Sequence, residues 1–487
     1  MKTYKNYVNN EWVDAAEKRT LVNPATGEPM AVVPESNKKE VEHAVQAARE
    51  AFDSGPWRET TAQHRGRILF AMADLVRRNA ASLAELETRN CGKPIVESEM
   101  DIADTASCLE YYGGLATKIH GETLPVPDNA LNFTLKEPVG VAGLIVPWNY
   151  PLMLAAWKLG PALAAGCTVV LKPAEETPLT SLEFARLVQK QIPDLPPGVL
   201  NVVSGEGTTA GRALVESQGV DKISFTGGTN TGRDILRSIA ASHLKKVSLE
   251  LGGKSPNIFF ADADLDAATD GALFGVFINQ GEVCSAGSRV LIQQDIYKKF
   301  LKRMKDKTKR IKLGDPLNRG TKMGPLVSSE HLKKVTGYLE LGKKEAKLIA
   351  GGGIPKSAKL KNGYFVEPTV FETDNTTRIA REEIFGPVVA CIPFKNEVDA
   401  VRIANDTPYG LAAAVWSRDI FKCLNVVRNL RAGIVWVNTM QPCYVESPWG
   451  GYKQSGQGRE LGLHGVEEFL ETKQVHINLS EKPIGWY

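Results

Sequence analysis

Apolar residues recur at helical spacing in the N-terminal part of the chain. Within residues 38–53, one helix face carries Val41, Ala44, Val45, Ala48 and Phe52. A second apolar face comprises Ile68, Met72, Leu75 and Val76. The pattern therefore predicts at least two amphipathic helices before the first long apolar run.

Farther along, short apolar runs that stop at proline, serine or glycine alternate with helical patterns. The runs are 141–146, 168–172, 199–203 and 223–226, and the helical patterns include 182–191 and 231–241. This alternation is typical of parallel strands joined by right-handed helical crossovers. It predicts a doubly wound sheet with helices on both faces.

A second alternating set follows Pro256. Its strand candidates are 256–260, 289–293, 388–392 and 433–437. With no repeat, low-complexity tract or proline-rich linker in between, we expect a second α/β domain that docks tightly on the first. The run 473–479 alternates enough to form a strand that pairs with another segment or another subunit.

Ligands of doubly wound sheets bind outside the carboxyl ends of the strands. Four short segments occupy such positions here: 147–149 (PWN), 172–175 (KPAE), 226–228 (TGG) and 250–253 (ELGG). We expect them to form one rim.

The bulk composition narrows the class of protein. A chain of 487 residues with 43% apolar residues can bury two or three domains. The net charge is +3, so nothing global indicates nucleic acid or membrane as a partner. The apolar runs are far shorter than the roughly 20 residues of a membrane span, and the N-terminus has no apolar signal core. We therefore expect a cytoplasmic protein.

One segment, 298–312, is locally basic. Apolar residues accompany it at helical spacing, namely Ile296, Phe300, Leu301 and Met304. A solvated helix face is the favoured interpretation, and an anion or partner patch is the alternative.

The cysteine pattern argues against disulfides and against a structural zinc site. The seven cysteines are an odd number, widely spread and without a Cys-x-x-Cys pair. Only Cys284, in NQGEVCSAGSR (279–289), sits among small, polar and flexible neighbours, which makes it the best candidate for a reactive thiol. The histidines form no recognisable signature with it, so a Cys/His hydrolase is weakly supported.

Three further features are ambiguous when each is taken singly. Glu250 ends an apolar run before a double glycine, where it could be a buried general base or a salt-bridged surface residue. Asn149, between Pro147 and Pro151, could donate to an oxyanion or cap a turn. Residues 227–232 (GGTNTG) follow a strand and open a helix, which suits a diphosphate but is a weak signal alone.

Together these segments resemble the aldehyde dehydrogenase superfamily along essentially the whole chain. The motifs, in the family's order, are PWNYP (147–151), KPAEETP (172–178), FTGGTNTG (225–232), ELGGKSPNI (250–258), NQGEVCSAGSR (279–289), EEIFGPV (382–388) and PWGGYKQSGQGRELG (448–462).

The resemblance implies a mechanism. Cys284 is the expected nucleophile, and the Asn149 amide and the Cys284 backbone N–H are expected to hold the oxyanion. Glu250 would activate the water that hydrolyses the thioester, which favours an acid as product over a coenzyme A ester. Lys158 and Glu460 match positions used in proton relay.

The resemblance also implies NAD as cofactor and no metal. Lys172 and Glu175 match residues that grip the adenosine ribose, and a carboxylate there would repel the 2′-phosphate of NADP. Gly227 and Gly232 frame the diphosphate turn, and Gly228 replaces the serine often found there. Trp148, Glu383 and Phe385 match the contacts on the nicotinamide side. The remaining expected cofactor contacts are Val146, Pro147, Glu250, Leu251, Gly252 and Cys284.

The implied architecture is the aldehyde dehydrogenase-like α/β fold. It comprises a Rossmann-type NAD-binding domain (1–122 and 143–250), an α/β catalytic domain (251–469) and a small β bridging element (123–142 and 470–487). We expect a homodimer or homotetramer.

For the substrate, the resemblance favours an amino or trimethylammonium aldehyde. Tyr150, Trp157, Cys443 and Trp449 match the aromatic pocket of the betaine aldehyde and amino aldehyde dehydrogenases, which holds cations by cation–π attraction. Asp101 and Asp104 match acidic residues that receive the amine.

There is one departure from that pattern. Ile278 stands where those enzymes often carry an aromatic residue, which weakens betaine aldehyde in particular. Core packing of Trp157 remains an alternative, as does a broad specificity for uncharged aliphatic or aromatic aldehydes.

Overall fold

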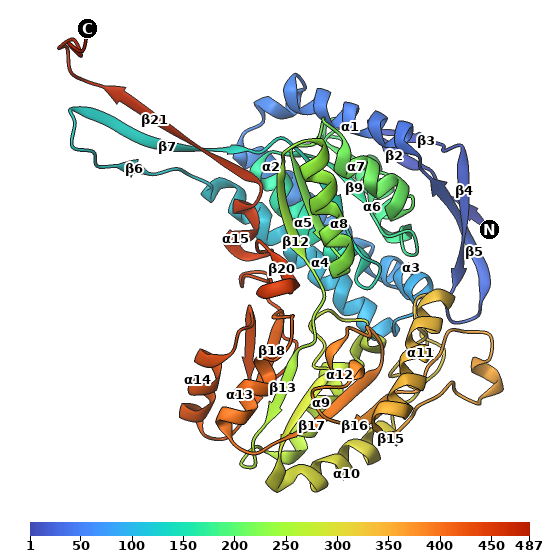
Figure 1. Ribbon diagram of the computed structural model, residues 1–487. Helices are drawn as coiled ribbons and strands as arrows, with labels where there is room; N and C mark the ends of the chain where they lie inside the picture. Colours follow the sequence, from blue (N-terminus) through green and yellow to red (C-terminus); the bar gives the residue numbers. More distant parts are fainter.

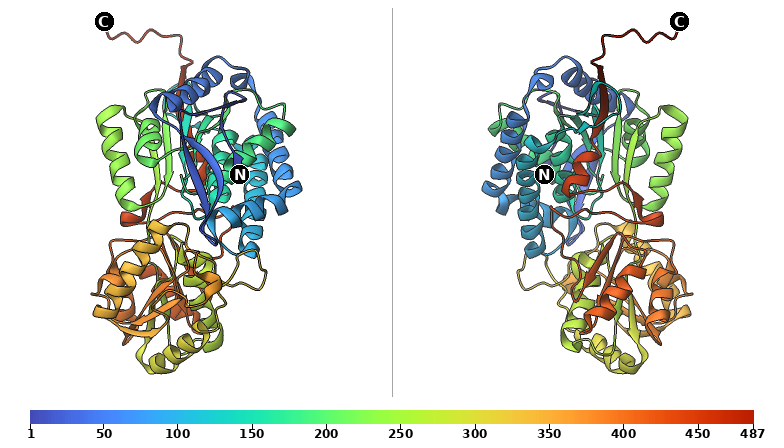
Figure 2. Two further views of the ribbon diagram at one scale, coloured as in Figure 1. Left: turned by 90° about the vertical axis from the view of Figure 1, so that its right-hand side faces the viewer. Right: turned by 90° about the vertical axis from the view of Figure 1, so that its left-hand side faces the viewer.

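The computed structural model describes all 487 residues and contains two large sheets, each flanked by helices (Figure 1). The views in Figure 2 show them as two lobes, the first built mainly from the N-terminal half of the chain and the second mainly from residues after 250. The helices are α1 (Lys38–Asp53), α2 (Ala62–Arg78), α3 (Ala80–Cys91), α4 (Ile95–Leu115), α5 (Pro151–Ala165), α6 (Leu179–Gln191), α7 (Arg212–Glu216), α8 (Thr229–Ser242), α9 (Leu265–Phe277), α10 (Tyr297–Thr308), α11 (Ser329–Glu345), α12 (Arg378–Arg381), α13 (Glu397–Asn405), α14 (Ile420–Asn429) and α15 (Gly462–Glu467).

The first lobe is built on an eight-stranded sheet. Its order is β20 (Gly456–Gln457), β12 (Lys246–Glu250), β11 (Lys222–Thr226), β8 (Val141–Ile145), β9 (Thr168–Lys172), β10 (Leu200–Val202), β2 (Asn6–Val8) and β3 (Glu11–Val13). The five strands from β12 to β10 are parallel to one another, whereas β20, β2 and β3 pair antiparallel with their neighbours. The predicted doubly wound sheet is confirmed.

Alternate residues of this sheet enter two different cores. In β8, Val141 and Ile145 pack with α1, α7 and α8, whereas Ala142 and Leu144 pack with α2, α4, α5 and α6. Because both faces are covered by helices, these strands read as continuous apolar runs.

The second lobe is built on a seven-stranded sheet. Its order is β15 (Lys347–Ala350), β16 (Thr369–Glu372), β17 (Val388–Phe394), β14 (Arg289–Gln293), β13 (Pro256–Phe259), β18 (Ala412–Trp416) and β19 (Ile434–Val437). Only β15 is antiparallel to its neighbour. All the strands predicted after Pro256 are present, so the second α/β unit is confirmed.

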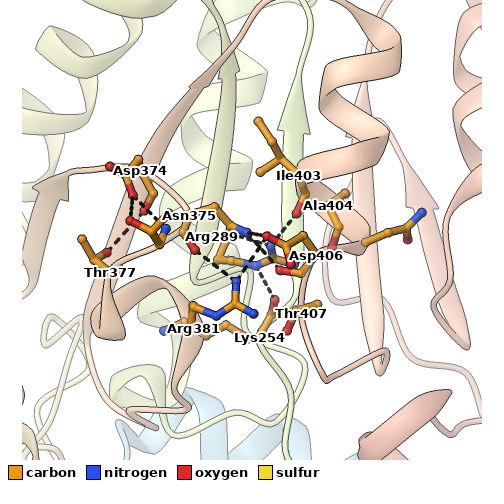
Figure 3. Close-up of polar contacts among 12 residues, drawn as sticks. Lys254, Arg289, Asp374, Asn375, Thr377, Arg381, Ile403, Ala404, Asp406 and Thr407 are labelled. Atoms are coloured by element: carbon orange, nitrogen blue, oxygen red, sulfur yellow. Dashed lines mark hydrogen bonds and ion pairs between the residues drawn. The ribbon is translucent and has the colours of Figure 1, made fainter.

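Arg289 fastens the end of α13 to two loops of the second lobe (Figure 3). The guanidinium is completely buried. It donates to the carbonyl of Lys254 (2.9 Å), to Asn375 Oδ1 (3.0 Å) and to the last carbonyls of α13, at Ile403 (2.9 Å) and Ala404 (2.7 Å). Each of its three nitrogens therefore has an acceptor.

A slender three-stranded arm projects from the first lobe (Figure 1). It consists of β6 (Thr123–Leu124), β7 (Ala130–Pro138) and β21 (Leu470–Asn478), with β21 paired to β7 along its whole length. The predicted C-terminal strand is therefore present. A separate sheet of β1 (Lys2–Thr3), β5 (Glu28–Glu35) and β4 (Glu17–Asn23) was not predicted.

Strand pairing cuts across two of the predicted domain boundaries. Residues 456–457, which fall within the predicted catalytic domain, form β20 and pair with β12 of the first sheet. Residues 141–142, assigned to the bridging element, begin β8 of the same sheet. The division into domains stays a prediction.

The basic segment forms α10, in which Phe300, Leu301 and Met304 are buried and the lysines face outward. The predicted amphipathic helix is confirmed. None of the helices combines the length and apolarity needed to cross a bilayer.

Candidate active site

A cavity of about 240 Å³ lies where strand ends of the first sheet meet loops of the second lobe. The predicted site residues that line it are Pro147, Trp148, Asn149, Gly227, Gly228, Glu250, Leu251, Gly252, Cys284, Glu383 and Phe385. Thr226, predicted as part of the rim of strand ends, also lines it, as do Leu154, His331 and Lys334, which were not predicted. The structure thus brings together residues from distant motifs, as the rule for strand ends predicts.

Cys284 follows a strained stretch of backbone between α9 and β14. Asn279, Gln280 and Gly281 all have positive φ values, of 47°, 55° and 75°. A Cβ at Gly281 would lie 2.3 Å from the Gly386 carbonyl oxygen, so only glycine fits there. This left-handed run leads the chain into the cavity and leaves the thiol partly exposed.

The surroundings of Cys284 disfavour the thiolate form of its side chain. Burial raises the pKa of Cys284 above its usual value, and the carboxyl groups of Glu383 and Glu250 raise it further. Attack on an aldehyde therefore requires a base that removes the proton.

Asn149 is held by the loop that carries the nucleophile. The Asn149 side-chain Nδ2 donates to the main-chain carbonyl of Glu282 at 2.8 Å, and the main-chain carbonyl of Asn149 accepts from Asn279 Nδ2 at 2.9 Å. An amide nitrogen has two hydrogens, so one N–H remains for a ligand. The turn and the oxyanion interpretations of Asn149 are therefore compatible.

Glu250 ends β12 and is neither exposed nor salt-bridged. Both carboxyl oxygens are buried without a hydrogen-bond partner. Burial, followed by the charge of Glu460, raises the pKa of Glu250 well above its usual value, and Lys158 opposes the shift. The ordinary interpretation of Glu250 as a salt-bridged surface residue is therefore wrong.

Lys158 and Glu460 form a buried ion pair near Glu250. Lys158 Nζ contacts Glu460 Oε1 and donates to Thr226 Oγ1 at 2.8 Å. Glu460 Oε2 is buried without a partner. The three groups form a chain of ionisable residues behind the cavity.

The adenosine side of the expected cofactor site lies at the end of β9. Lys172 Nζ is 3.1 Å from Glu175 Oε2, and the Gly207 N–H donates to Glu175 Oε1 at 3.5 Å. Burial pushes the pKa of Glu175 upward, but Lys172 and the hydrogen bonds bring it below its usual value. Glu175 is therefore a carboxylate at neutral pH.

The glycines at the start of α8 form an open cradle. Gly228 is the N-cap residue and offers no side-chain cap, and a Cβ placed there would meet nothing closer than Thr231 Oγ1 at 3.9 Å. Gly232 packs on Leu251, where a Cβ would come within 2.7 Å of its side chain. Free N–H groups at a helix start fit a diphosphate, so the residues present suit a dinucleotide.

The far side of the cavity is formed by the motif that contains Glu383 and Phe385. Glu383 Oε1 accepts from the Gly253 N–H at 3.0 Å, and a Cβ at Gly252 would lie 2.3 Å from Glu383 Oε2. The Phe385 ring stands edge-on to Trp148 at 5.1 Å. By contrast, Val146 is buried behind the cavity, with its N–H bonded to the Lys172 carbonyl.

The predicted aromatic pocket contains a tryptophan cluster. The ring centroids of Trp157 and Trp449 are 5.4 Å apart, and Trp436, which was not predicted, lies 6.3 Å from Trp449. Cys443 is partly buried nearby, and Ile278 is the C-cap residue that follows α9. The Trp157 side chain is largely buried, so it is a packing residue whatever else it does.

An internal cation already occupies part of this pocket. Lys93 Nζ lies 4.1 Å from the centroid of the Tyr150 ring and forms an ion pair with Asp101. Asp104 reaches solvent, but the protein around it removes part of its hydration, and this partial desolvation together with the Asp101 charge raises its pKa to about 6. Asp101 and Asp104 therefore lie in different environments, although the sequence comparison predicted the same role for both.

Comparison with known proteins agrees with this geometry. The model of the aldehyde dehydrogenase family matches residues 12–475. Betaine aldehyde dehydrogenase of Bacillus subtilis is 47% identical over 99% of both chains. Human mitochondrial aldehyde dehydrogenase is 48% identical over 98% of this chain and 92% of its own.

The similarity extends to solved structures. Betaine aldehyde dehydrogenase of Staphylococcus aureus in complex with NAD+ superimposes with a TM-score of 0.97 at 43% identity, covering 99% of this chain and 96% of that chain. An NAD+ complex of a Bacillus cereus aldehyde dehydrogenase gives 0.95 at 44% identity, covering 98% and 97%. The chain belongs to the aldehyde dehydrogenase family. The predicted family, fold class and class of enzyme are confirmed.

Proposed function

We propose that this chain oxidises an aldehyde to the carboxylic acid, with NAD as the hydride acceptor and Cys284 as the nucleophile. The observation that carries the proposal is the Glu250 carboxyl group, which is buried without partners in the same cavity as Cys284 and Asn149. An unpaired buried carboxyl is costly for the fold, and a base poised for proton transfer explains the cost.

The first step is attack of the Cys284 sulfur on the aldehyde carbon. Because the thiol pKa is raised, a base must take the thiol proton as the carbon–sulfur bond forms. The ionised form of Glu250 takes it, and the raised pKa of Glu250 makes that carboxylate a stronger base. The free N–H of Asn149 and the Cys284 backbone N–H stabilise the oxyanion of the resulting thiohemiacetal.

The cofactor is held by Lys172 and Glu175 at the ribose, by the N–H groups at the start of α8, and by Glu383. NAD, when bound, accepts the hydride from the adduct, which leaves a thioester on Cys284. The Lys158–Glu460 pair is placed to carry the thiol proton away from Glu250, which restores its carboxylate. Glu250 then removes a proton from the water that attacks the thioester carbon. As the carbon–sulfur bond breaks and the acid leaves, Glu250 returns that proton to the Cys284 sulfur and restores the thiol.

For the substrate, we favour an amino or trimethylammonium aldehyde. Two relatives that share the whole chain are betaine aldehyde dehydrogenases, and Trp157 and Trp449 supply aromatic faces in this chain. Lys93 already contacts the Tyr150 ring and pairs with Asp101. The groups left to bind the substrate cation are therefore the tryptophans and Asp104. Broad specificity for uncharged aldehydes is the alternative, which Ile278 favours; the human relative, of similar identity, is named simply an aldehyde dehydrogenase.

We expect self-association through the arm. The outer edge of β21 has no strand neighbour, and Leu131, Leu135 and Ile477 are exposed on the arm. An open strand edge with apolar side chains favours pairing with a second copy. Light scattering distinguishes the expected homodimer or homotetramer from a monomer. A cytoplasmic location stays a prediction, which cell fractionation tests.

The activity is tested by following NADH formation with betaine aldehyde, 4-aminobutanal, hexanal and benzaldehyde. The highest kcat/KM with the cationic aldehydes would support the substrate class, and a higher value with hexanal or benzaldehyde would favour broad specificity. Cys284→Ala is the blank. The proposed activity is wrong if no aldehyde gives NADH above that blank.

A further inference from the structure

Glu282 is buried at the base of the loop 279–285, here called the nucleophile loop, and touches several parts of the site. Its main-chain carbonyl accepts from Asn149 Nδ2 at 2.8 Å, and its Oε1 accepts from the Val327 N–H at 3.1 Å. Cys284 follows two residues later. A shift of Glu282 would therefore displace the oxyanion donor and the thiol together.

His331 lies in the first turn of α11 and supports the opposite part of the cavity lining, Trp148, Glu383 and Phe385, here called the cofactor wall. Its ring is 5.0 Å from that of Trp148. Its Nε2 is 2.6 Å from the Phe385 carbonyl oxygen, and since a carbonyl only accepts, Nε2 carries the proton.

That hydrogen bond acts on a strained residue. Phe385 has a φ of +61°, in the left-handed region that residues with a side chain avoid. The turn it forms also carries Glu383, two residues earlier. By bonding the Phe385 carbonyl, His331 helps to hold the conformation that places Glu383 in the cavity.

Glu282 and His331 meet between the nucleophile loop and the cofactor wall. Glu282 Oε1 lies 3.6 Å from His331 Nε2. Burial lowers the pKa of His331 to about 4 and raises the pKa of Glu282 well above its usual value. Both shifts favour the uncharged forms of the two groups, which reduces the cost of burying them beside the cofactor wall.

We propose that Glu282 and His331 are positioning residues that couple the nucleophile loop to the cofactor wall. Neither takes part in the chemistry described above. Through this contact, which adds to the hydrogen bonds of Asn149 with the loop, a disturbance of the wall reaches the thiol, and a disturbance of the loop reaches the cofactor site. Such coupling is reciprocal, because it is a free energy shared by the two sites.

The test measures, for each variant, both the cofactor site and the reactivity of the thiol, so that a change on one side of the contact can be detected on the other. His331→Phe keeps an aromatic ring against Trp148 but removes the N–H donor, and Glu282→Ala removes the carboxyl group. Two quantities are measured on the full-length protein: the dissociation constant of NAD, and the rate constant of Cys284 alkylation by iodoacetamide with Cys284→Ala as blank. Neither depends on which aldehyde the enzyme oxidises, so the result stands apart from the substrate assignment.

We expect each variant to change both quantities by about tenfold, the effect of about one buried hydrogen bond. We expect the double variant to be no worse than the more affected single variant, because coupled residues are not additive. His331→Gln and Glu282→Gln, which retain a donor and an acceptor, should stay within about threefold of the wild type. The exposed His243→Phe should change neither quantity.

The proposal is overturned if His331→Phe alters only NAD binding while Glu282→Ala alters only alkylation. It is equally overturned if the glutamine variants, folded as judged by their thermal unfolding, lose as much as the truncations.

Discussion

Glu250 and Arg289 are both buried ionisable groups near the ends of strands, yet their surroundings differ in one respect. Arg289 has a partner for every nitrogen, and Asn375 connects it to Asp406 through two hydrogen bonds of 2.9 Å (Figure 3). Glu250 has no partner on either oxygen. The difference separates a group that holds the architecture from one that is kept available for reaction.

The largest expected effect follows replacement of Glu250. Glu250→Gln keeps the shape of the side chain but cannot accept a proton, so kcat should fall about a thousandfold. If water activation is the step lost, rapid mixing should show a burst of NADH followed by slow turnover. Thermal unfolding should show no loss of stability, because no partner is lost. A kcat within tenfold of the wild type would show that Glu250 is not the catalytic base.

Replacement of Arg289 should do the reverse, with its main effect on stability. Arg289→Met leaves several buried carbonyls unpaired and should lower the free energy of unfolding by about 3–5 kcal/mol. Arg289→Lys is the matched control, since it keeps the charge but not the fork of donors, and should recover only part of the loss. Urea unfolding followed by tryptophan fluorescence measures both. An unchanged unfolding midpoint for Arg289→Met would show that Arg289 does not stabilise the fold, and the contrast with Glu250 would fail.

Glu175 is intermediate between these two, since it has partners but is still partly exposed. Glu175→Gln removes a negative charge from the ribose site, so discrimination against NADP should weaken by about tenfold. The ratio of kcat/KM for NAD and NADP measures this. Glu206→Gln, on a nearby exposed loop, is the control, and an equal change there would assign selectivity to general charge.

The smallest expected effect is the pH dependence of stability. The pKa of Glu250 is raised above its ordinary value of 4.5 by burial first, so the folded state retains a proton that the unfolded state releases. Glu250 therefore lowers the free energy of unfolding progressively as pH rises from about 4.5 through its raised pKa. The difference between wild type and Glu250→Gln should show this slope. A difference that grows as pH falls would contradict the sign.

Apolar runs and motif spacing were sufficient to predict most of the architecture and many cavity residues. Strands such as β9 and β14 match the predicted runs residue for residue, because both their faces are buried. Local sequence singled out Cys284 and left Glu250 and Asn149 ambiguous, and the resemblance to the aldehyde dehydrogenase superfamily assigned a role to each of the three.

What escaped prediction depends on contacts between distant segments. The contacts of Lys93 with Tyr150 and Asp101 form only when the chain folds, so no local pattern reveals them. His331 belongs to no local motif either. The two residues of β20 carry too little pattern to be recognised as a strand. Trp436 lies in a predicted strand, but an apolar residue there says nothing about which neighbour it packs against.

The position of β20 affects how the chain folds while it is being synthesised. The first sheet begins with residues near the N-terminus, yet its last strand is residues 456–457 of 487. During synthesis on the ribosome, β12 therefore waits with an open edge until almost the whole chain has been made. A prematurely terminated chain would keep that edge exposed, which is the kind of surface that recruits chaperones or starts aggregation.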